Sequence, residues 1–189
     1  LALEQDINHS PVSAADRPTL QAELFPIDLR QAEATAQAIA RIQPEQVVHL
    51  AAAGVTNPAI DPAVALGHNT QGSLNLLNAC FQNPNLGSTP RKLIVIRTPG
   101  ESKPANAYTA SKAATWCFCQ MFARRSHWPI VGAKVFQAYG PGQPAHTFVQ
   151  AALRAAVAGE DFAMTSGNQT RDWIFLDDVV RGLVAILDT

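Results

Sequence analysis

A tyrosine and a lysine stand four residues apart in AYTASKAA, residues 107–114, within a segment expected to be helical. Positions i and i+4 lie one helical turn apart, so the phenol of Tyr108 and the ammonium of Lys112 are expected on one face. A nearby cation favours the phenolate and lowers the phenol pKa, and such a tyrosine can exchange a proton with an alcohol or ketone near neutral pH. The alternative is a half-buried tyrosine beside a solvated lysine, which the spacing alone does not exclude.

The composition suits a globular protein. The chain has 189 residues, of which 47% are hydrophobic and 15% charged, enough for one domain or for one domain and part of another. A formal net charge of −1 gives no sign of a nucleic-acid or acidic membrane partner. No apolar run is long enough to span a bilayer, and no signal-peptide pattern opens the chain. Three cysteines, with no cluster of metal-ligand spacing, favour a reducing compartment and no metal site. These features predict a soluble cytoplasmic protein.

Predicted strands alternate with predicted helices along the chain. Strands are expected at residues 1–6, 22–29, 44–53, 91–96, 129–136 and 171–176, and helices at 31–42, 61–81, 107–127, 147–158 and from 177 to the end. Asp61 and Pro62 have the types expected at the N-cap and first position of the second helix, and Asp177 and Asp178 are expected to cap the last one. This alternation predicts a three-layer α/β fold, a Rossmann-like doubly wound parallel sheet.

The Gly- and Pro-rich turn at residues 140–144 is the best candidate for a domain boundary. It would separate a main domain, residues 1–140, from the start of a small C-terminal lobe, residues 141–189. In an open parallel sheet, ligands bind at the carboxyl ends of the strands. Asp28, the stretch 51–53, Thr98 and the stretch 136–139 all fall at such ends, and the helix with Tyr108 follows the fourth strand. One rim of the sheet is therefore the predicted site.

Five motifs occur here in the order found in one known family. They are HLAA (49–52), DPAVALGHNTQGSLNLLNAC (61–80), YTASK (108–112), KVFQAYGPGQ (134–143) and RDWIFLDDV (171–179). In these motifs the chain resembles the extended short-chain dehydrogenase/reductases, and more narrowly the NAD-dependent epimerase/dehydratase group that acts on nucleotide sugars. The resemblance covers roughly residues 22 to 189. It implies an NAD(P)-binding Rossmann-like domain with part of a substrate-binding lobe.

The resemblance also implies roles for residues. Tyr108 matches the catalytic acid/base, Lys112 the lysine that binds the nicotinamide ribose and lowers the tyrosine pKa, and Thr98 the Ser/Thr after the fourth strand. The expected cofactor contacts, besides Tyr108 and Lys112, are Asp28, Leu29, Leu50, Ala51, Ala52, Asn69 and Phe136. Asp28 would accept a hydrogen bond from the adenine amino group. Arg171, with its planar fork of donors, and Gln137 are the expected substrate contacts. The bland alternatives are a turn-forming Asp28 and an Arg171 paired on the surface with Asp172.

The sequence departs from the family pattern in three places. The first strand and the glycine-rich turn GxxGxxG that contacts the cofactor pyrophosphate are absent, since the first glycine is Gly54. Thr98 stands only ten residues before Tyr108, where the family has a longer loop, which puts its role in doubt. The family's Arg and Asn before the YGP sequence are Lys134 and Gln137 here. The absent turn and the short loop are either true deletions in the protein or segments that the given sequence leaves out.

Three functions remain open from the sequence. The first is an NAD-dependent enzyme that transfers a hydride to and from a nucleotide sugar. Such an enzyme would be an isomerase (epimerase), a lyase (dehydratase) or an oxidoreductase. The second is a short-chain reductase of a smaller carbonyl compound. The third is a non-catalytic dinucleotide-binding or scaffold protein. NADP is the alternative cofactor, although Glu4 or Asp6 in the strand predicted at residues 1–6 would favour NAD. The helices at 63–80 and 107–127 are those through which the family usually forms homodimers.

Overall fold

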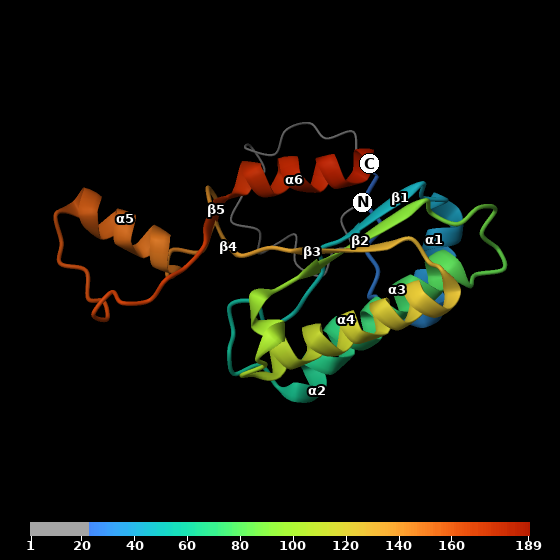
Figure 1. The fold of residues 1–189 in the computed structure, drawn as a ribbon, viewed down its shortest axis with the longest axis horizontal. Helices are drawn as coiled ribbons and strands as arrows, with labels where there is room; N and C mark the ends of the chain where they lie inside the picture. Colours follow the sequence, from blue (N-terminus) through green and yellow to red (C-terminus); the bar gives the residue numbers. More distant parts are fainter. Residues whose placement is uncertain (1–22) are drawn as a thin grey trace. The chain divides into compact units, whose positions relative to one another are not determined.

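The computed structural model describes residues 23–189, which divide into two compact units. The described parts of these units are residues 23–135 and 136–189, and each is described by itself below. Figure 1 shows the order of the elements along the chain. The predicted strand at residues 1–6, and with it Glu4 and Asp6, lies outside the described residues.

The first unit is built on a parallel three-stranded sheet with the order β1-β2-β3. Its strands are β1 (Gln46–His49), β2 (Lys92–Arg97) and β3 (Ile130–Lys134), in register from Gln46 opposite Lys92 and from Leu93 opposite Ile130. A helical connection follows each of the first two strands, as parallel neighbours require. The prediction of a Rossmann-like α/β fold with a parallel sheet is therefore confirmed.

The helices of this unit are α1 (Ala32–Ile42), α2 (Pro62–Ala65), α3 (Gly72–Phe81) and α4 (Ala107–Ser126), with a π-helical segment η2 (Leu66–Gln71) and a 3₁₀ turn η3 (Pro99–Ser102). Helices α3 and α4 run alongside each other against the sheet (Figure 1). The core cluster joins Ile39 of α1 and Leu77 of α3 to Leu93 and Val95 of β2. Ile94, which alternates with them, is fully buried on the opposite face, as expected for a central parallel strand.

The second predicted strand, residues 22–29, is wrong for the described residues 23–29. They form an irregular segment that ends in a turn and pairs with no strand of the sheet. Pro26 lacks the N–H that a ladder would need. The segment instead lies along α1, where the guanidinium of Arg41 bonds to Glu23 at 3.0 Å and lies 5.0 Å from the ring centre of Phe25.

The third predicted strand, residues 44–53, is too long. Strand β1 ends at His49, and the backbone of Ala53 bonds to the side chain of Asn69 rather than to a neighbouring strand. The fifth strand also stops early, at Lys134, whereas β2 continues unbroken through Ile96 and Arg97. At Ala53, a side-chain partner thus takes the backbone bonds that a longer strand would have used.

The helix predicted at 61–81 is present but interrupted. Asp61 caps it through bonds from the N–H groups of Ala63 and Val64, with Pro62 at the first position, as predicted. Its middle, Leu66–Gln71, is π-helical, which the apolar periodicity did not indicate. Helix α4 begins, as expected, at residue 107, with Asn106 and Thr109 forming a capping box.

The second unit contains α5 (Phe148–Ala158), α6 (Leu176–Asp188) and a two-stranded parallel sheet of β4 (Gln137–Tyr139) and β5 (Trp173–Phe175). Strand β4 was not among the predicted strands, and its pairing with β5 is a long-range contact that local sequence does not specify. The predicted cap of the last helix is wrong. The helix begins at Leu176, so that Asp177 and Asp178 lie in its first turn, where carboxylates stabilise the helix dipole.

No helix in the described part of the chain combines the length and apolar character needed to cross a bilayer. Within the same residues no group of three or more His, Cys, Asp or Glu side chains is placed to hold a metal ion. The three cysteines of the sequence, Cys80, Cys117 and Cys119, are free thiols.

Candidate active site

Thr98 and Tyr108 meet at the carboxyl end of β2 despite the short loop between them. Thr98 follows β2 directly and caps the 3₁₀ turn η3, which carries the chain back to the start of α4. The side chain of Thr98 lies close to the phenol of Tyr108, and this contact lowers the phenol pKa. The 3₁₀ turn η3 thus connects Thr98 to the start of α4 without the longer loop of the family, and the catalytic role of Thr98 stays a prediction.

Tyr108 is half-buried in the first turn of α4. Burial and the negative charge of Glu101 raise the pKa of its phenol above the ordinary value of 10.0, and the contact with Thr98 opposes this. Lys112 is not among the groups that shift this pKa. The sequence predicted that Lys112 would lower the pKa of Tyr108, whereas the pKa is raised in this structure. The physical reason is that desolvation disfavours the phenolate and that the charge acting on it is the carboxylate of Glu101.

Lys112 lies one turn further along α4 and is buried, with 4% of its surface exposed. Burial lowers the pKa of its ammonium, while Glu101 and Cys119 act in the opposite direction. Lysines are rarely this enclosed, and the solvated lysine weighed as an alternative for AYTASKAA is therefore wrong. The same face of the helix therefore carries a half-buried phenol and a buried amine.

Asn69 joins the loop after β1 to helix α4. Its Oδ1 accepts from the N–H of Ala53 at 2.7 Å, and its Nδ2 donates to the carbonyl of Ala53 and to Oγ of Ser111, both at 2.9 Å. The side chain is 1% exposed. Asn69 thus fixes the strand end and the helix that carries Tyr108 relative to each other.

The π-helical segment frees the backbone carbonyl of Asn69 for side-chain donors. The N–H of Gly72 bonds five residues back to Gly67, and the carbonyl of Asn69 accepts from Oγ of Ser73 at 2.5 Å and from Oγ1 of Thr115 at 2.9 Å. Such π turns are common at functional sites. This one provides a second bond between the helix at 66–71 and α4.

His49, the last residue of β1, lies below this network. Its Nε2 is 2.7 Å from Oγ of Ser73, and the residue is 4% exposed. Burial, and secondarily the charge of Lys112, lower the pKa of His49 to about 4. His49 is therefore neutral in the folded chain at pH 7, which avoids a second positive charge near Lys112.

The predicted cofactor bed follows β1 directly. Leu50, Ala51 and Ala52 are exposed, with Leu50 at 64%, and the two alanines leave the strand end free of bulky side chains. A flat dinucleotide could lie over such a surface, and Leu50 would offer it an apolar contact. The exposure of these residues excludes the alternative that they form an ordinary core strand.

Asp28 and Leu29 lie in the turn before α1. Arg30 donates to both carboxylate oxygens of Asp28, at 2.6 to 3.0 Å, and this bond lowers the pKa of Asp28 to about 2. The side chain of Leu29 is in the hydrophobic core, and its carbonyl accepts from Asn75 at 2.8 Å. A cofactor contact of Leu29 would therefore be through its N–H, and an adenine on Asp28 would share the carboxylate with Arg30.

The remaining predicted residues belong to the second unit. Phe136 is exposed at its start, and Gln137 begins β4, where its N–H bonds to the carbonyl of Asp172. The guanidinium of Arg171 is exposed and donates to Gln169 at 2.7 Å and to the carbonyl of Thr170. An ion pair with Asp172 is not among the contacts of Arg171 in the described residues.

Glu101 and Arg97 were missed as part of this site. Glu101 is buried and bonds to Arg97 at 2.9 Å, and its negative charge raises the pKa values of both Tyr108 and Lys112. The sequence TPGE, residues 98–101, carries the Thr-x-x-Glu pattern of a capping box with proline at the first position. That pattern could have placed Glu101 against Thr98 before the structure was known.

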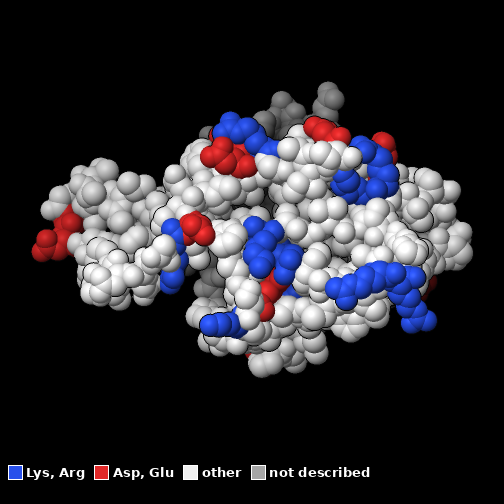
Figure 2. Space-filling view, in the orientation of Figure 1, with Lys and Arg blue, Asp and Glu red and all other residues white. Residues whose placement is uncertain are grey.

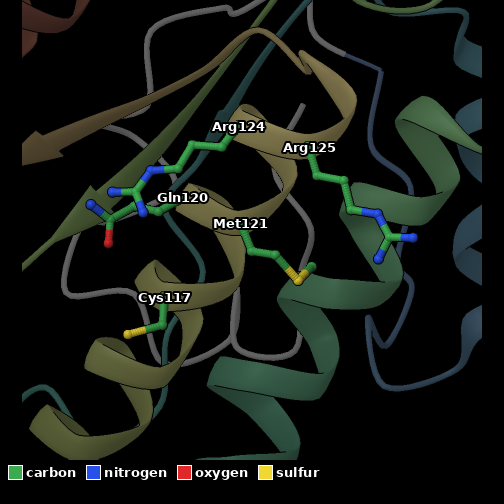
Figure 3. Close-up of a pocket in the computed structure, with 5 residues that line it drawn as sticks. All are labelled: Cys117, Gln120, Met121, Arg124 and Arg125. Atoms are coloured by element: carbon green, nitrogen blue, oxygen red, sulfur yellow. The ribbon is translucent and has the colours of Figure 1, made fainter.

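The hollow in Figure 3 is distinct from this site. It has a volume of about 470 Å³ and is lined by Cys117, Gln120, Met121, Arg124 and Arg125, all from the second half of α4. Tyr108 and Lys112 lie in the first half of the helix. On the face shown in Figure 2, basic and acidic side chains are interspersed among uncharged ones rather than gathered into a field of one sign.

The sequence matches the family model described as NAD dependent epimerase/dehydratase family over residues 3–189. This chain belongs to the NAD dependent epimerase/dehydratase family. The order of the five motifs and the geometry of the parallel sheet agree with this assignment.

Two curated relatives illustrate the range of the family. The chain is 28% identical to UDP-glucuronate 4-epimerase 3 of Arabidopsis thaliana over 159 residues, which covers 76% of this chain and 37% of the relative. It is 23% identical to dTDP-glucose 4,6-dehydratase 1 of Escherichia coli (strain K12) over 190 residues, covering 85% and 53% of the two chains. The chain therefore spans between about a third and a half of the length of these relatives.

Solved structures share the fold. UDP-glucose 4-epimerase from Thermotoga maritima, solved with UDP-glucose, has a TM-score of 0.77 at 24% identity and covers 92% of this chain and 61% of its own. UDP-glucose 4-epimerase from Thermus thermophilus, in complex with NAD, has a TM-score of 0.73 at 25% identity, covering 94% and 63%. The epimerase/dehydratase family member described here thus has the Rossmann-like architecture of these enzymes.

Proposed function

We propose that this chain carries the NAD-binding and proton-transfer half of an epimerase or dehydratase of nucleotide sugars. The observation that carries the proposal is a pair of side chains on one helix. Tyr108 is half-buried close to Thr98, and Lys112 is buried on the next turn of the same helix. A solvated, structural pair would have no need to enclose the amine. The family membership supplies the reaction class.

The residues at the carboxyl ends of β1 and β2 fit part of NAD. The exposed stretch at residues 50–52 is flat and largely small, and Lys112 and Tyr108 supply an amine and a hydroxyl for the ribose. Asp28 offers a carboxylate to adenine, shared with Arg30. The described residues provide no glycine-rich turn for the pyrophosphate, so that contact is not assigned to them.

In the proposed mechanism Tyr108 handles the proton and Thr98 orients it. Bound NAD supplies the hydride acceptor and donor. As a sugar hydroxyl is oxidised to a ketone, its proton passes to the phenolate oxygen of Tyr108; in the reverse direction the phenol returns the proton to the carbonyl oxygen. The raised pKa of Tyr108 favours the phenol, so the structure is best prepared for the protonating direction. The contact with Thr98 stabilises the phenolate needed for the other direction.

A Tyr108→Phe substitution tests this function. Turnover of UDP-glucose, UDP-glucuronate and dTDP-glucose is measured with NAD, together with NAD binding by calorimetry. We expect turnover to fall by about 10²- to 10⁴-fold, since one general acid/base is removed, while NAD binding persists. The Tyr139→Phe variant, which alters the other tyrosine of the chain, is the matched control. Full turnover by Tyr108→Phe would refute the mechanism.

The same measurements decide between the alternatives. A non-catalytic dinucleotide-binding or scaffold protein predicts no turnover of any sugar nucleotide by the unsubstituted protein. A short-chain reductase would instead consume NADH or NADPH with smaller ketones. Conversion of a UDP- or dTDP-sugar without net cofactor consumption would support the epimerase or dehydratase.

We also propose that the protein forms a homodimer through α2, η2 and α4. Large apolar side chains are exposed on these elements at Val64, Leu66, Phe118 and Met121. Apolar side chains gathered on adjacent helices are typical of interaction surfaces. Sedimentation equilibrium measures the mass directly, and a monomer at all concentrations would contradict this proposal.

A further inference from the structure

A buried carboxylate lies behind the Thr98–Tyr108 pair and has no role in the chemistry proposed above. The side chain of Glu101 is 3% exposed, and each of its oxygens has a defined donor. Its Oε1 accepts from the N–H of Thr98 at 2.9 Å, and its Oε2 accepts from Nε of Arg97 at 2.9 Å. A charged group this enclosed is costly unless it is fully paired, and Glu101 is paired at both oxygens.

The partner of Glu101 is itself fixed by three neighbouring elements. Arg97 ends β2, and its guanidinium carbon lies 4.1 Å from the ring centre of Trp116 on α4. Gly132 of β3 leaves the necessary space, because a Cβ there would lie 2.7 Å from Cδ of Arg97 and 2.5 Å from the ring of Trp116. The ion pair therefore has one geometry, set by packing rather than by solvent.

Thr98 receives its orientation from this ion pair. The carboxylate of Glu101 accepts from the backbone N–H of Thr98, and the backbone N–H of Glu101 donates to the carbonyl of Thr98 at 3.2 Å. With the backbone fixed at both points, the side chain of Thr98 is directed at the phenol of Tyr108. Three links thus connect Arg97 to the phenol of Tyr108, through Glu101 and Thr98.

We propose that Glu101, held by Arg97, is a positioning residue that acts through Thr98 to set the hydroxyl of Tyr108. The catalytic consequence rests on the proposed function, whereas the arrangement of the side chains does not. Replacing a buried ion pair by apolar residues is often neutral for stability. The proposal therefore assigns this pair a role in geometry rather than in stability.

Electrostatics supports the same assignment. Glu101 raises the pKa of Tyr108 and opposes the lowering of the pKa of Lys112. The charged and titratable groups facing this pair are Arg97 on β2, Glu101 on η3, Cys119 on α4 and His49 on β1. Glu101 is the acidic side chain that faces Tyr108 directly, so its removal changes the titration of Tyr108 in a known direction.

A direct titration of Tyr108 provides a test that needs no activity. The chain contains two tyrosines, so in a Tyr139→Phe background the near-ultraviolet absorbance of tyrosinate reports Tyr108 alone. We expect the pKa of Tyr108 to lie above the ordinary value in this background and to fall on Glu101→Gln, because a negative charge is removed. An unchanged value in a folded Glu101→Gln protein would overturn the proposal.

The matched control is Glu45→Gln. Glu45 also bonds to an arginine, Nε of Arg91 at 3.1 Å, but its side chain is 81% exposed at the opposite end of the strands. The titration of Tyr108 should be the same in Glu45→Gln as in the parent. A pKa of Tyr108 at or below the ordinary value in the parent would refute the geometry even if Glu101→Gln failed to fold.

Glu101→Asp separates position from charge. The shorter side chain keeps the negative charge but cannot reach both Thr98 and Arg97, so the pKa of Tyr108 should stay raised. In contrast, kcat should fall by about 10- to 100-fold with little change in KM, as expected for a misplaced catalytic group. Unaltered kcat in Glu101→Asp would overturn the positioning role. If Tyr108→Phe proves fully active, the proposed function fails instead, and the absorbance titration still tests the contact with Glu101.

Discussion

Acid should destabilise this protein through His49. The residue is buried at the end of β1, where burial and the charge of Lys112 lower the pKa from 6.5 to about 4. A difference of this size corresponds to a free energy on the order of 3 kcal/mol. Above about pH 6.5 the imidazole is neutral in both the folded and the unfolded chain, and stability is unaffected. As the pH falls from about 6.5 to about 4, the unfolded chain binds a proton that the folded chain does not, so stability is lost.

Urea unfolding followed by tryptophan fluorescence measures this loss, since the chain has three tryptophans. The informative variant is His49→Gln, which keeps an amide within reach of the Oγ of Ser73, 2.7 Å from the histidine ring, but does not titrate. Between pH 7 and pH 4 the parent should lose about 3 kcal/mol more unfolding free energy than the variant. Carboxylates titrate in both proteins and cancel in the comparison. Parallel pH profiles for the two proteins would refute the reasoning.

Two further substitutions test the positioning of the site. Asn69→Ala leaves the N–H and C=O of Ala53 without their side-chain partner, so the unfolding free energy should fall by about 1 to 3 kcal/mol; no loss in urea unfolding would show that water or backbone replaces the bonds. Gly132→Ala places a Cβ 2.5 Å from the ring of Trp116, and overpacking of this kind costs about 1 to 3 kcal/mol. A thermal midpoint equal to that of the parent would contradict this second expectation.

The sequence predicted the elements whose signals are local. Asp61 and Pro62 marked a helix start, the apolar run at 91–96 marked a strand buried on both faces, and the spacing of Tyr108 and Lys112 marked one helix face. Each signal depends on residues a few positions apart, which the chain presents without regard to its tertiary neighbours.

The errors occurred where a distant side chain decides the local structure. Ala53 leaves the sheet because Asn69, sixteen residues away, takes its backbone bonds. The predicted sign of the pKa shift at Tyr108 was wrong because the spacing of the tyrosine and lysine shows neither the burial of the phenol nor the charge of Glu101. Strand β4 was missed because its partner, β5, lies more than thirty residues further along the chain.

The π-helical turn at Leu66–Gln71 carries a consequence for how this chain can evolve. It holds one residue more than an α-helix would need, and each residue of an α-helix turns the chain by about 100°. Deleting one residue there would restore a regular α-helix. The same deletion would rotate the residues that follow about the helix axis and turn the buried side chains of Leu76 and Leu77 away from the core. Gaining one would do the same in the other direction. Single insertions and deletions in this stretch should therefore be selected against far more strongly than substitutions.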